Sequence, residues 1–378
     1  MKIVIAIWSL RMGGAEMFSK HLAKELLKRG HDVYLFPLFD PYDLSVLSVI
    51  QREKIPILIP IKTGLFSWMI WKLNALFVHL FSFRFRDYLT QHYFLNQIKK
   101  KRIQLVISNS SMTDEFMAKN LLEIPFLSVE HGQYSIAITD REVIDRKALG
   151  KAAQVVSVSR WCAALLNEQL KIDSKVIYSG HLKNENMDGL SETIDRKIFT
   201  FTMIARGVSQ KGWDVAIKAF LKVIVTKQAK LVLVGTGEYL LELQKSYNHP
   251  AIVFKGQMDS INQVIHETDI GLFPSRKYEA FGLSILDFFS QGKPVLASDL
   301  GGIPEVISDS LGAGGLLIQL NDGQEPDVNH LSALMAEVMD KESLRSELSK
   351  NALRLAERFD FQKTVDEYEQ VCVNVMRK

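Results

Sequence analysis

Cysteine is scarce in this sequence, and its placement excludes two kinds of protein. Among 378 residues only Cys162 and Cys372 occur, far apart and each within an apolar segment. A secreted disulfide scaffold and a cysteine-ligated metal module are therefore excluded, and a reducing, cytoplasmic environment is expected. The pair Asp-x-Asp, two carboxylates that could hold a divalent cation against a phosphate, is absent as well. No metal site of that kind is expected.

The sequence also lacks a long uninterrupted apolar run. The amino-terminal run, residues 2–8, is too short for a signal peptide and is typical of a buried strand. The strongly apolar stretch 65–88 contains Lys72, Asn74 and His79, which argues against a membrane-spanning helix. Two interpretations of this stretch stay open. It forms either buried packing helices or an interfacial helix whose aromatic side chains enter a lipid surface.

Net charge is small, at +3, and gives no indication of a nucleic-acid partner. The distribution is uneven, because residues 1–190 carry a net charge of +7 and the remainder −4. An anionic partner is therefore expected for the first half only. The basic run 99–102 would face anionic headgroups if residues 65–102 lay on a membrane, although the dipole of a helix also favours basic residues at its end.

What the sequence does contain is two successive series of strands and helices. The first begins with the strand at 2–8, followed by a glycine turn at Gly13 and Gly14 and then a helix. A polar segment, 181–194, has the composition of a linker, and a second series starts at residue 198. This order is typical of doubly wound sheets, whose ligands bind beyond the carboxyl ends of the strands.

We therefore predict an α/β protein made of two Rossmann-like doubly wound domains that face each other across a cleft. The predicted boundaries are 1–185 for the first domain and 186–360 for the second. The last helix, within 361–378, is expected to pack back on the first domain.

One stretch, residues 271–288, combines the features of a ligand site. A short apolar strand turns into a helix there, which leaves backbone N–H groups free near Gly282 and favours an anion. Glu279 stands just before those donors. Asp287 follows within an apolar run, where a carboxylate is costly unless a polar group meets it. The simpler alternative, in which Glu279 is a surface loop acid and Asp287 is the one polar residue of an amphipathic helix, explains less of this pattern.

Taken together, these residues resemble the retaining glycosyltransferases of family 4, the glycosyl transferases group 1, which have the GT-B fold. The similarity runs from the glycine turn at 13–16 to Glu305 and is strongest over 199–308. One departure is clear. The family pattern is glutamate, seven residues and glutamate, whereas this chain ends it with Asp287. The other matching positions are Arg206, Lys211 and Gly301-Gly302-Ile303-Pro304-Glu305.

The resemblance implies that the domain 1–185 binds the acceptor and that the domain 186–360 binds the nucleotide sugar. It also implies a role for each matching position. Arg206 and Lys211 would hold the donor diphosphate, whose negative charge grows as it departs. Glu279 would bind hydroxyls of the donor sugar, and Asp287 would bind the ribose with a side chain one methylene shorter than the family's. His131 would stand at the first-domain wall beside the reacting sugar. Further donor-binding positions are glycine turns and free backbone N–H groups, namely Gly13, Gly14, Gly235, Ala280, Phe281, Gly282 and Leu283.

The implied activity is metal-independent hexosyl transfer with retention of configuration. The donor would be a nucleotide sugar, with UDP favoured over GDP, and no other cofactor is expected. The acceptor would be a saccharide or a lipid-linked saccharide, in the assembly of surface polysaccharide or glycolipid. Contact with the inner face of the plasma membrane through 65–102 belongs to the interfacial interpretation of that stretch.

Functions of other classes share parts of this pattern. A non-catalytic scaffold of the same fold is motivated by Asp287, and a nucleotide-sugar hydrolase or epimerase would share the donor site. A nicotinamide-dependent oxidoreductase is disfavoured, because Leu240 occupies the third glycine position of the fingerprint that begins at Gly235.

Overall fold

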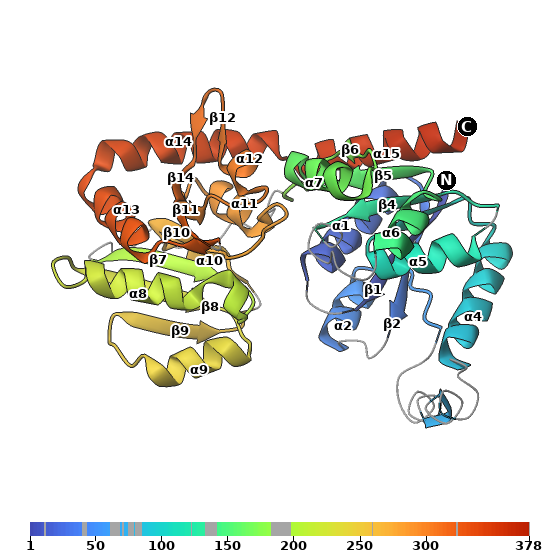
Figure 1. The fold of residues 1–378 in the computed structure, drawn as a ribbon, viewed down its shortest axis with the longest axis horizontal. Coiled ribbons are helices and arrows are strands. Elements are labelled where there is room, and N and C mark those ends of the chain that lie inside the picture. Colours follow the sequence, from blue (N-terminus) through green and yellow to red (C-terminus); the bar gives the residue numbers. More distant parts are fainter. Residues whose placement is uncertain are drawn as a thin grey trace. The chain divides into compact units, whose positions relative to one another are not determined.

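The computed structural model describes two compact units (Figure 1). One consists of Met1–Ile177 with Gln362–Lys378, and the other of Tyr178–Phe361. The chain thus crosses between units after Ile177, whereas the sequence placed the boundary after residue 185. The residues described are 1–10, 13–39, 44–60, 69, 72–74, 79, 85–121, 123–132, 142–182, 198–258, 260–322 and 324–377.

The first unit is built on a six-stranded parallel sheet in the order β2-β1-β3-β4-β5-β6. Its central strands are buried along most of their length, as expected for strands covered on both faces. Strand order reverses between β1 and β3, which marks that edge as the place for a ligand. The strands are β1 (Lys2–Ser9), β2 (Asp32–Phe39), β3 (Leu105–Ser108), β4 (Phe126–Glu130), β5 (Gln154–Ser157) and β6 (Lys175–Val176).

The carboxyl-terminal helix α15 (Phe361–Arg377) belongs to the first unit from Gln362 onward. Hydrogen bonds join this helix to the end of α1, since Arg29 and His31 both contact the carboxylate of Glu369, at 2.9 and 2.8 Å. The other helices of the unit are α1 (Gly14–Lys28), α2 (Leu44–Arg52), α4 (Phe85–Lys101), α5 (Ser111–Asn120), α6 (Glu142–Leu149) and α7 (Arg160–Leu170).

The second unit has another six-stranded parallel sheet, in the order β14-β11-β10-β7-β8-β9. The order reverses between β7 and β10, so the loops after these two strands meet at the switch point. Its strands are β7 (Phe199–Ile204), β8 (Ala229–Val234), β9 (Ile252–Gly256), β10 (Ile270–Phe273), β11 (Val295–Ser298) and β14 (Gly315–Ile318), with the short pairs β12 (Ser308–Asp309) and β13 (Gly312–Ala313), and β15 (Leu320–Asn321) and β16 (Glu325–Pro326).

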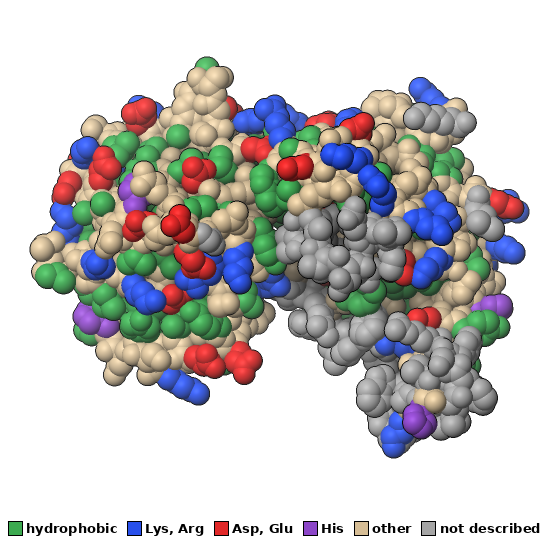
Figure 2. Space-filling view, in the orientation of Figure 1, with side chains coloured by type: hydrophobic (Ala, Val, Ile, Leu, Met, Phe, Trp, Pro, Cys, Tyr) green, Lys and Arg blue, Asp and Glu red, His purple; other side chains and the backbone are tan. Residues whose placement is uncertain are grey.

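Helices cover the second sheet, and Trp213 and Phe220 of α8 are fully buried in its core. On the face drawn in Figure 2, acidic and basic side chains are interspersed over this unit. Its helices are the 3-10 turn η1 (Ser209–Lys211), α8 (Trp213–Val223), α9 (Glu238–Ser246), α10 (Asn262–His266), α11 (Leu283–Phe289), α12 (Ile303–Ile307), α13 (Val328–Asp340) and α14 (Glu342–Arg358).

Most of the apolar stretch 65–88 lies outside the described residues, so neither interpretation of it is tested. The helix that follows, α4, carries Lys99, Lys100 and Lys101 in its last turn. Within the described part of the chain, no helix is both long and apolar enough to cross a membrane. Most of the predicted linker 181–194 is likewise outside the described residues.

Candidate active site

The loops that follow β7 and β10 lie against each other at the switch point of the second unit. The backbone N–H of Arg276 donates to the carbonyl of Gln210 at 2.9 Å, and the Gln210 side chain donates to the carbonyl of Tyr278 at 3.3 Å. One loop carries Lys211 and the other Glu279. Two positions that are 68 residues apart in sequence are thereby brought to one edge of the sheet.

Lys211 and Glu279 form the charged centre of this site. The ammonium of Lys211 lies 2.5 Å from Oε2 of Glu279, and the Ser275 hydroxyl donates to the same oxygen at 3.3 Å. Both charged side chains are only about one-fifth exposed, at 22% and 18%. Partial burial strengthens the pairing and holds both groups in place beside a small cavity of about 20 Å³, whose lining includes Lys211, Ser275, Glu279, Gly282 and Ile285.

Arg206 lies at the start of the same loop as Lys211. Its carbonyl accepts a hydrogen bond from the indole N–H of the buried Trp213 at 2.9 Å, which fixes the backbone. The residue itself is exposed, and among the described residues its guanidinium has no hydrogen-bond or ion-pair partner. The backbone of Arg206 is therefore fixed, and its guanidinium is exposed to solvent.

An ion pair that the sequence analysis missed joins the loop after β10 to helix α8. Arg276, from the loop after β10, donates to both carboxylate oxygens of Asp214 on α8, at 2.9 and 3.2 Å. Burial alone would raise the pKa of Asp214, but hydrogen bonds from Arg276 and Lys218 hold it below its usual range. A bidentate ion pair of this kind fixes the orientation of both side chains as well as pairing their charges. No sequence pattern indicated the pair, because its members are 62 residues apart.

Two glycines allow backbones to approach closely around this site. A Cβ on Gly301, at φ +61°, would lie 2.1 Å from the carbonyl oxygen of Glu279, which also accepts the N–H of Gly302 at 2.9 Å. Gly301 thus fixes the backbone of Glu279 from the loop after β11. A Cβ on Gly235 would lie 2.0 Å from the carbonyl of Ala205, so its direct role is loop packing.

Helix α11 begins at Leu283, slightly later than the sequence predicted, and has seven residues. Gly282 caps its start at φ +91°, a left-handed conformation that favours glycine. Neither Gly282 nor Leu283 donates its N–H to a backbone carbonyl among the described residues. Ala280 and Phe281 precede the helix, and Phe281 packs inward, 3% exposed, with its ring tilted by 32° against that of Tyr178.

Asp287 differs from the sequence-based picture of a buried carboxylate that needs a ligand. Its side chain is 30% exposed, and its Oδ1 lies 3.2 Å from Nδ1 of His181. The amphipathic surface of α11 explains the exposure, because Asp287 lies between buried neighbours at Leu286 and Phe288 without being buried itself. Sequence reasoning missed His181, which lies just after the crossover into this unit.

The remaining predicted residues belong to the first unit. His131 follows β4, and its Nε2 lies 3.1 Å from Oδ1 of Asn109, whose amide donates to the Ser19 hydroxyl at 2.8 Å. Because the amide N–H₂ faces Ser19, its oxygen faces His131, so Nε2 carries the proton and Nδ1 is left as an acceptor. Burial lowers the pKa of His131 to about 4, so the ring is neutral at pH 7.

Gly13 and Gly14 lie at the same edge of the first sheet. Gly13 is the extended residue before α1, and Gly14 is the first residue of that helix. The helix begins just beyond the carboxyl end of β1, where the strand order reverses. The predicted site residues thus form two groups, with His131, Gly13 and Gly14 in the first unit and all the others in the second.

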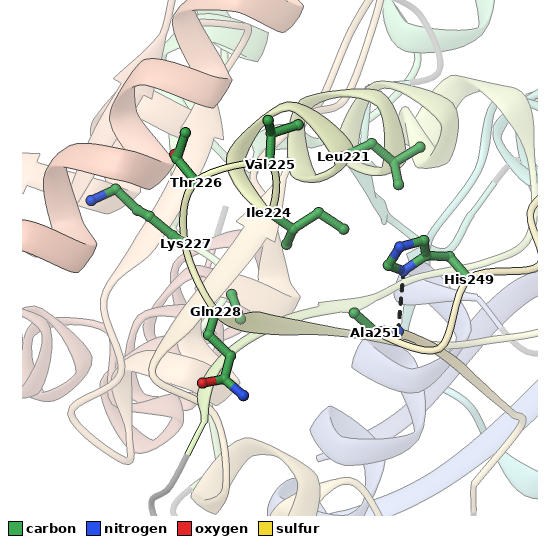
Figure 3. Close-up of a pocket in the computed structure, with 9 residues that line it drawn as sticks. Leu221, Ile224, Val225, Thr226, Lys227, Gln228, His249 and Ala251 are labelled. Carbon is green, nitrogen blue, oxygen red and sulfur yellow. Dashed lines mark hydrogen bonds between the residues drawn. The ribbon is translucent and has the colours of Figure 1, made fainter.

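A larger cavity, of about 570 Å³, opens elsewhere on the second unit (Figure 3). It lies where α8 ends and β8 begins, and Figure 3 shows both aliphatic side chains, such as Leu221 and Ile224, and polar ones, such as Gln228, around it. Two of its polar side chains have partners within the unit, since Lys227 pairs with Asp340 and the His249 ring accepts the N–H of Ala251 at 3.2 Å. The cavity lies at the amino-terminal edge of the sheet, whereas ligands of doubly wound sheets bind beyond the carboxyl ends of the strands, so the opposite edge is the candidate active site.

Comparisons with known proteins cover both units of the chain. A family model described as glycosyl transferases group 1 matches residues 196–337, and one described as glycosyltransferase family 4 matches residues 12–181. The N-acetyl-alpha-D-glucosaminyl L-malate synthase of Bacillus anthracis is 24% identical, over 97% of this chain and 95% of its own. An uncharacterized glycosyltransferase of Methanocaldococcus jannaschii is 25% identical, over 76% of this chain and 80% of its own.

Among solved structures, HepE of Anabaena, crystallised with UDP, superimposes with a TM-score of 0.75 at 18% identity, over 99% of this chain and 100% of its own. This likeness shows that the two doubly wound units form the GT-B fold. With a family model on each unit and the same fold in a solved relative, the chain is a glycosyltransferase that belongs to the family 4, or group 1, glycosyltransferases.

Proposed function

We propose that this glycosyltransferase moves a hexose from a nucleotide sugar, with UDP favoured as the nucleotide, and retains the anomeric configuration. The observation that carries the proposal is the Lys211–Glu279 pair at the switch point of the second unit, 2.5 Å between charged atoms. Arg206, whose guanidinium has no partner among the described residues, lies on the same loop. Similarity to HepE, solved with UDP and with UDP-glucose, supports the choice of nucleotide.

The proposed role of each residue follows from its charge and from the hydrogen bonds that it can make. Lys211 and Arg206 bind the diphosphate, and they stabilise it further as the bond to the sugar breaks and negative charge collects on the leaving oxygen. The N–H groups of Gly282 and Leu283 add donors to the same phosphates. Glu279, held in place by Lys211, accepts hydrogen bonds from hydroxyls of the donor sugar.

Two other residues complete the donor site in this proposal. Asp287 accepts a hydrogen bond from the ribose. His131, neutral at pH 7, offers its Nδ1 as an acceptor to a sugar hydroxyl and so orients the sugar without supplying a proton. Orientation of this kind lowers the barrier by positioning the reacting atoms beforehand.

The proposed reaction needs no separate protein base. The bond between the anomeric carbon and the phosphate oxygen breaks, and the acceptor hydroxyl forms its bond to that carbon from the same face. The acceptor's proton passes to the departing phosphate oxygen, so the product is the glycoside and the nucleoside diphosphate. The protein supplies fixed charge and position.

The acceptor we propose is a saccharide or lipid-linked saccharide in surface polysaccharide or glycolipid assembly, met in the cytoplasm at the inner face of the plasma membrane through residues 65–102. The cationic last turn of α4 supports this assignment. A non-catalytic scaffold and a nucleotide-sugar hydrolase or epimerase are alternatives that transfer no sugar to an acceptor, so detection of a glycoside product would eliminate them.

Binding of UDP, measured by titration calorimetry with and without EDTA, tests the donor proposal. We expect saturable binding that chelation does not weaken, because Lys211 and Arg206 supply the positive charge that a divalent cation would otherwise bring. GDP is titrated in parallel. Absence of binding by both nucleotides would contradict the donor assignment, and binding that EDTA abolishes would contradict the metal-free site.

A further inference from the structure

His181 is a buried histidine for which the site described above has no use. Its side chain is 10% exposed, and its Nε2 has no hydrogen-bond partner among the described residues. Its Nδ1 contacts Oδ1 of Asp287 at 3.2 Å. A buried ring nitrogen without a partner is costly, and such a group calls for an explanation.

The backbone of His181 does not need the imidazole for its own placement. Its N–H donates to the carbonyl of Phe359 at 2.7 Å, and its carbonyl accepts the N–H of Phe361 at 3.0 Å. These two hydrogen bonds hold the residue from both sides. The side chain is therefore anchored on a fixed backbone and directed at a single group, the carboxylate of Asp287.

The two carboxylate oxygens of Asp287 have different surroundings. Oδ1 meets the ring N–H of His181, and Oδ2 has no partner among the described residues. Because the side chain is 30% exposed, Oδ2 remains accessible to a ligand. A carboxylate fixed at one oxygen loses less rotamer freedom when the other binds a hydroxyl, which strengthens binding.

We propose that His181 is a positioning residue for recognition of the donor ribose. By holding Oδ1 of Asp287, it directs Oδ2 towards the ribose hydroxyls and compensates for the side chain that is one methylene shorter than glutamate. This inference rests on the proposed function, since it requires that a nucleoside diphosphate bind the second unit with Asp287 at its ribose. It adds a residue that touches no ligand itself.

The test compares dissociation constants for UDP and for 2′,3′-dideoxy-UDP, which lacks both ribose hydroxyls, by titration calorimetry. The wild type should prefer UDP by about tenfold or more, the effect of hydrogen bonds to a charged group. His181→Ala should lose most of that preference, and Asp287→Ala all of it. His181→Asn should keep it, because the asparagine amide places an N–H donor near the position of Nδ1.

His249→Ala, which removes an exposed histidine of the same unit, is the matched control and should keep the full preference. The ratio of the two constants is read within each variant, so a change in the folded fraction does not affect it. If His181→Ala weakened both nucleotides equally and left the ratio unchanged, its role would be structural and the inference would be overturned, with the proposed function intact. If neither UDP nor GDP bound the wild type, the proposed function itself would fail.

Discussion

Replacing Lys211 with methionine should lower the turnover number for sugar transfer by about 10²–10³-fold, the range found when one group that stabilises a developing oxyanion is removed. Methionine keeps most of the aliphatic stem and removes the ammonium that lies 2.5 Å from Glu279. The change has two consequences. The leaving diphosphate loses a positive charge, and Glu279 loses the partner that fixes it for the donor sugar.

The measurement is steady-state release of nucleoside diphosphate from the nucleotide sugar that the wild type consumes. The turnover number should fall along with kcat/KM, because the interaction strengthens as charge develops in the transition state. Lys222→Met, an exposed lysine on α8 that bonds Asn329, is the matched control and should behave as the wild type. A raised KM with an unchanged turnover number would mean that Lys211 binds donor and transition state equally, against the proposed role.

The second large effect concerns stability and pH, through His131. Burial lowers the pKa of this ring to about 4, whereas in the unfolded chain it keeps its ordinary value of about 6.5. Between those values the unfolded state binds a proton that the folded state does not. The contribution of the neutral ring to the free energy of unfolding is therefore complete above about pH 6.5 and is lost as the pH falls towards 4. The loss is at most about 3 kcal/mol, and it is smaller to the extent that water reaches the ring.

His131→Gln isolates this contribution, because glutamine can still bond Asn109 but does not titrate. Urea unfolding at pH 7 and at pH 4.5 should show a smaller loss of unfolding free energy in the variant than in the wild type. All other titrating groups are shared, so the difference belongs to His131. Equal losses in both proteins would contradict a lowered pKa, as would an NMR titration of the ring with a midpoint near 6.5.

The two parallel sheets could be predicted because their strands are short, apolar and separated by glycine turns and helices. The strand predicted at 2–8 is observed at Lys2–Ser9, and the second series, predicted from residue 198, begins with β7 at Phe199. Helices α13 and α14 were not predicted, and neither was β14. These three elements follow the last glycine turn that the sequence analysis used, Gly301-Gly302. The amphipathic patterns of the two helices become informative only when the sheet that they cover is known.

The candidate site was only partly accessible from sequence. Lys211 and Glu279 could be proposed from a family pattern, and the structure places them together. Arg276, Asp214 and His181 were not proposed, because each is defined by a contact between distant segments. Asp287 shows the limit most clearly. Apolar neighbours in sequence suggested a buried carboxylate, yet helix geometry leaves it partly exposed and gives it a histidine partner.

The most direct test of the account is the configuration of the glycoside that the enzyme makes. Wild-type enzyme would be incubated with the nucleotide sugar and acceptor that support turnover, and the product's anomeric proton coupling measured by NMR. Front-face transfer with the diphosphate oxygen taking the proton predicts the donor's own configuration, so an α-linked donor should give an α-linked product. A β-linked product from that donor would contradict the mechanism and the roles assigned to Lys211, Arg206 and Glu279.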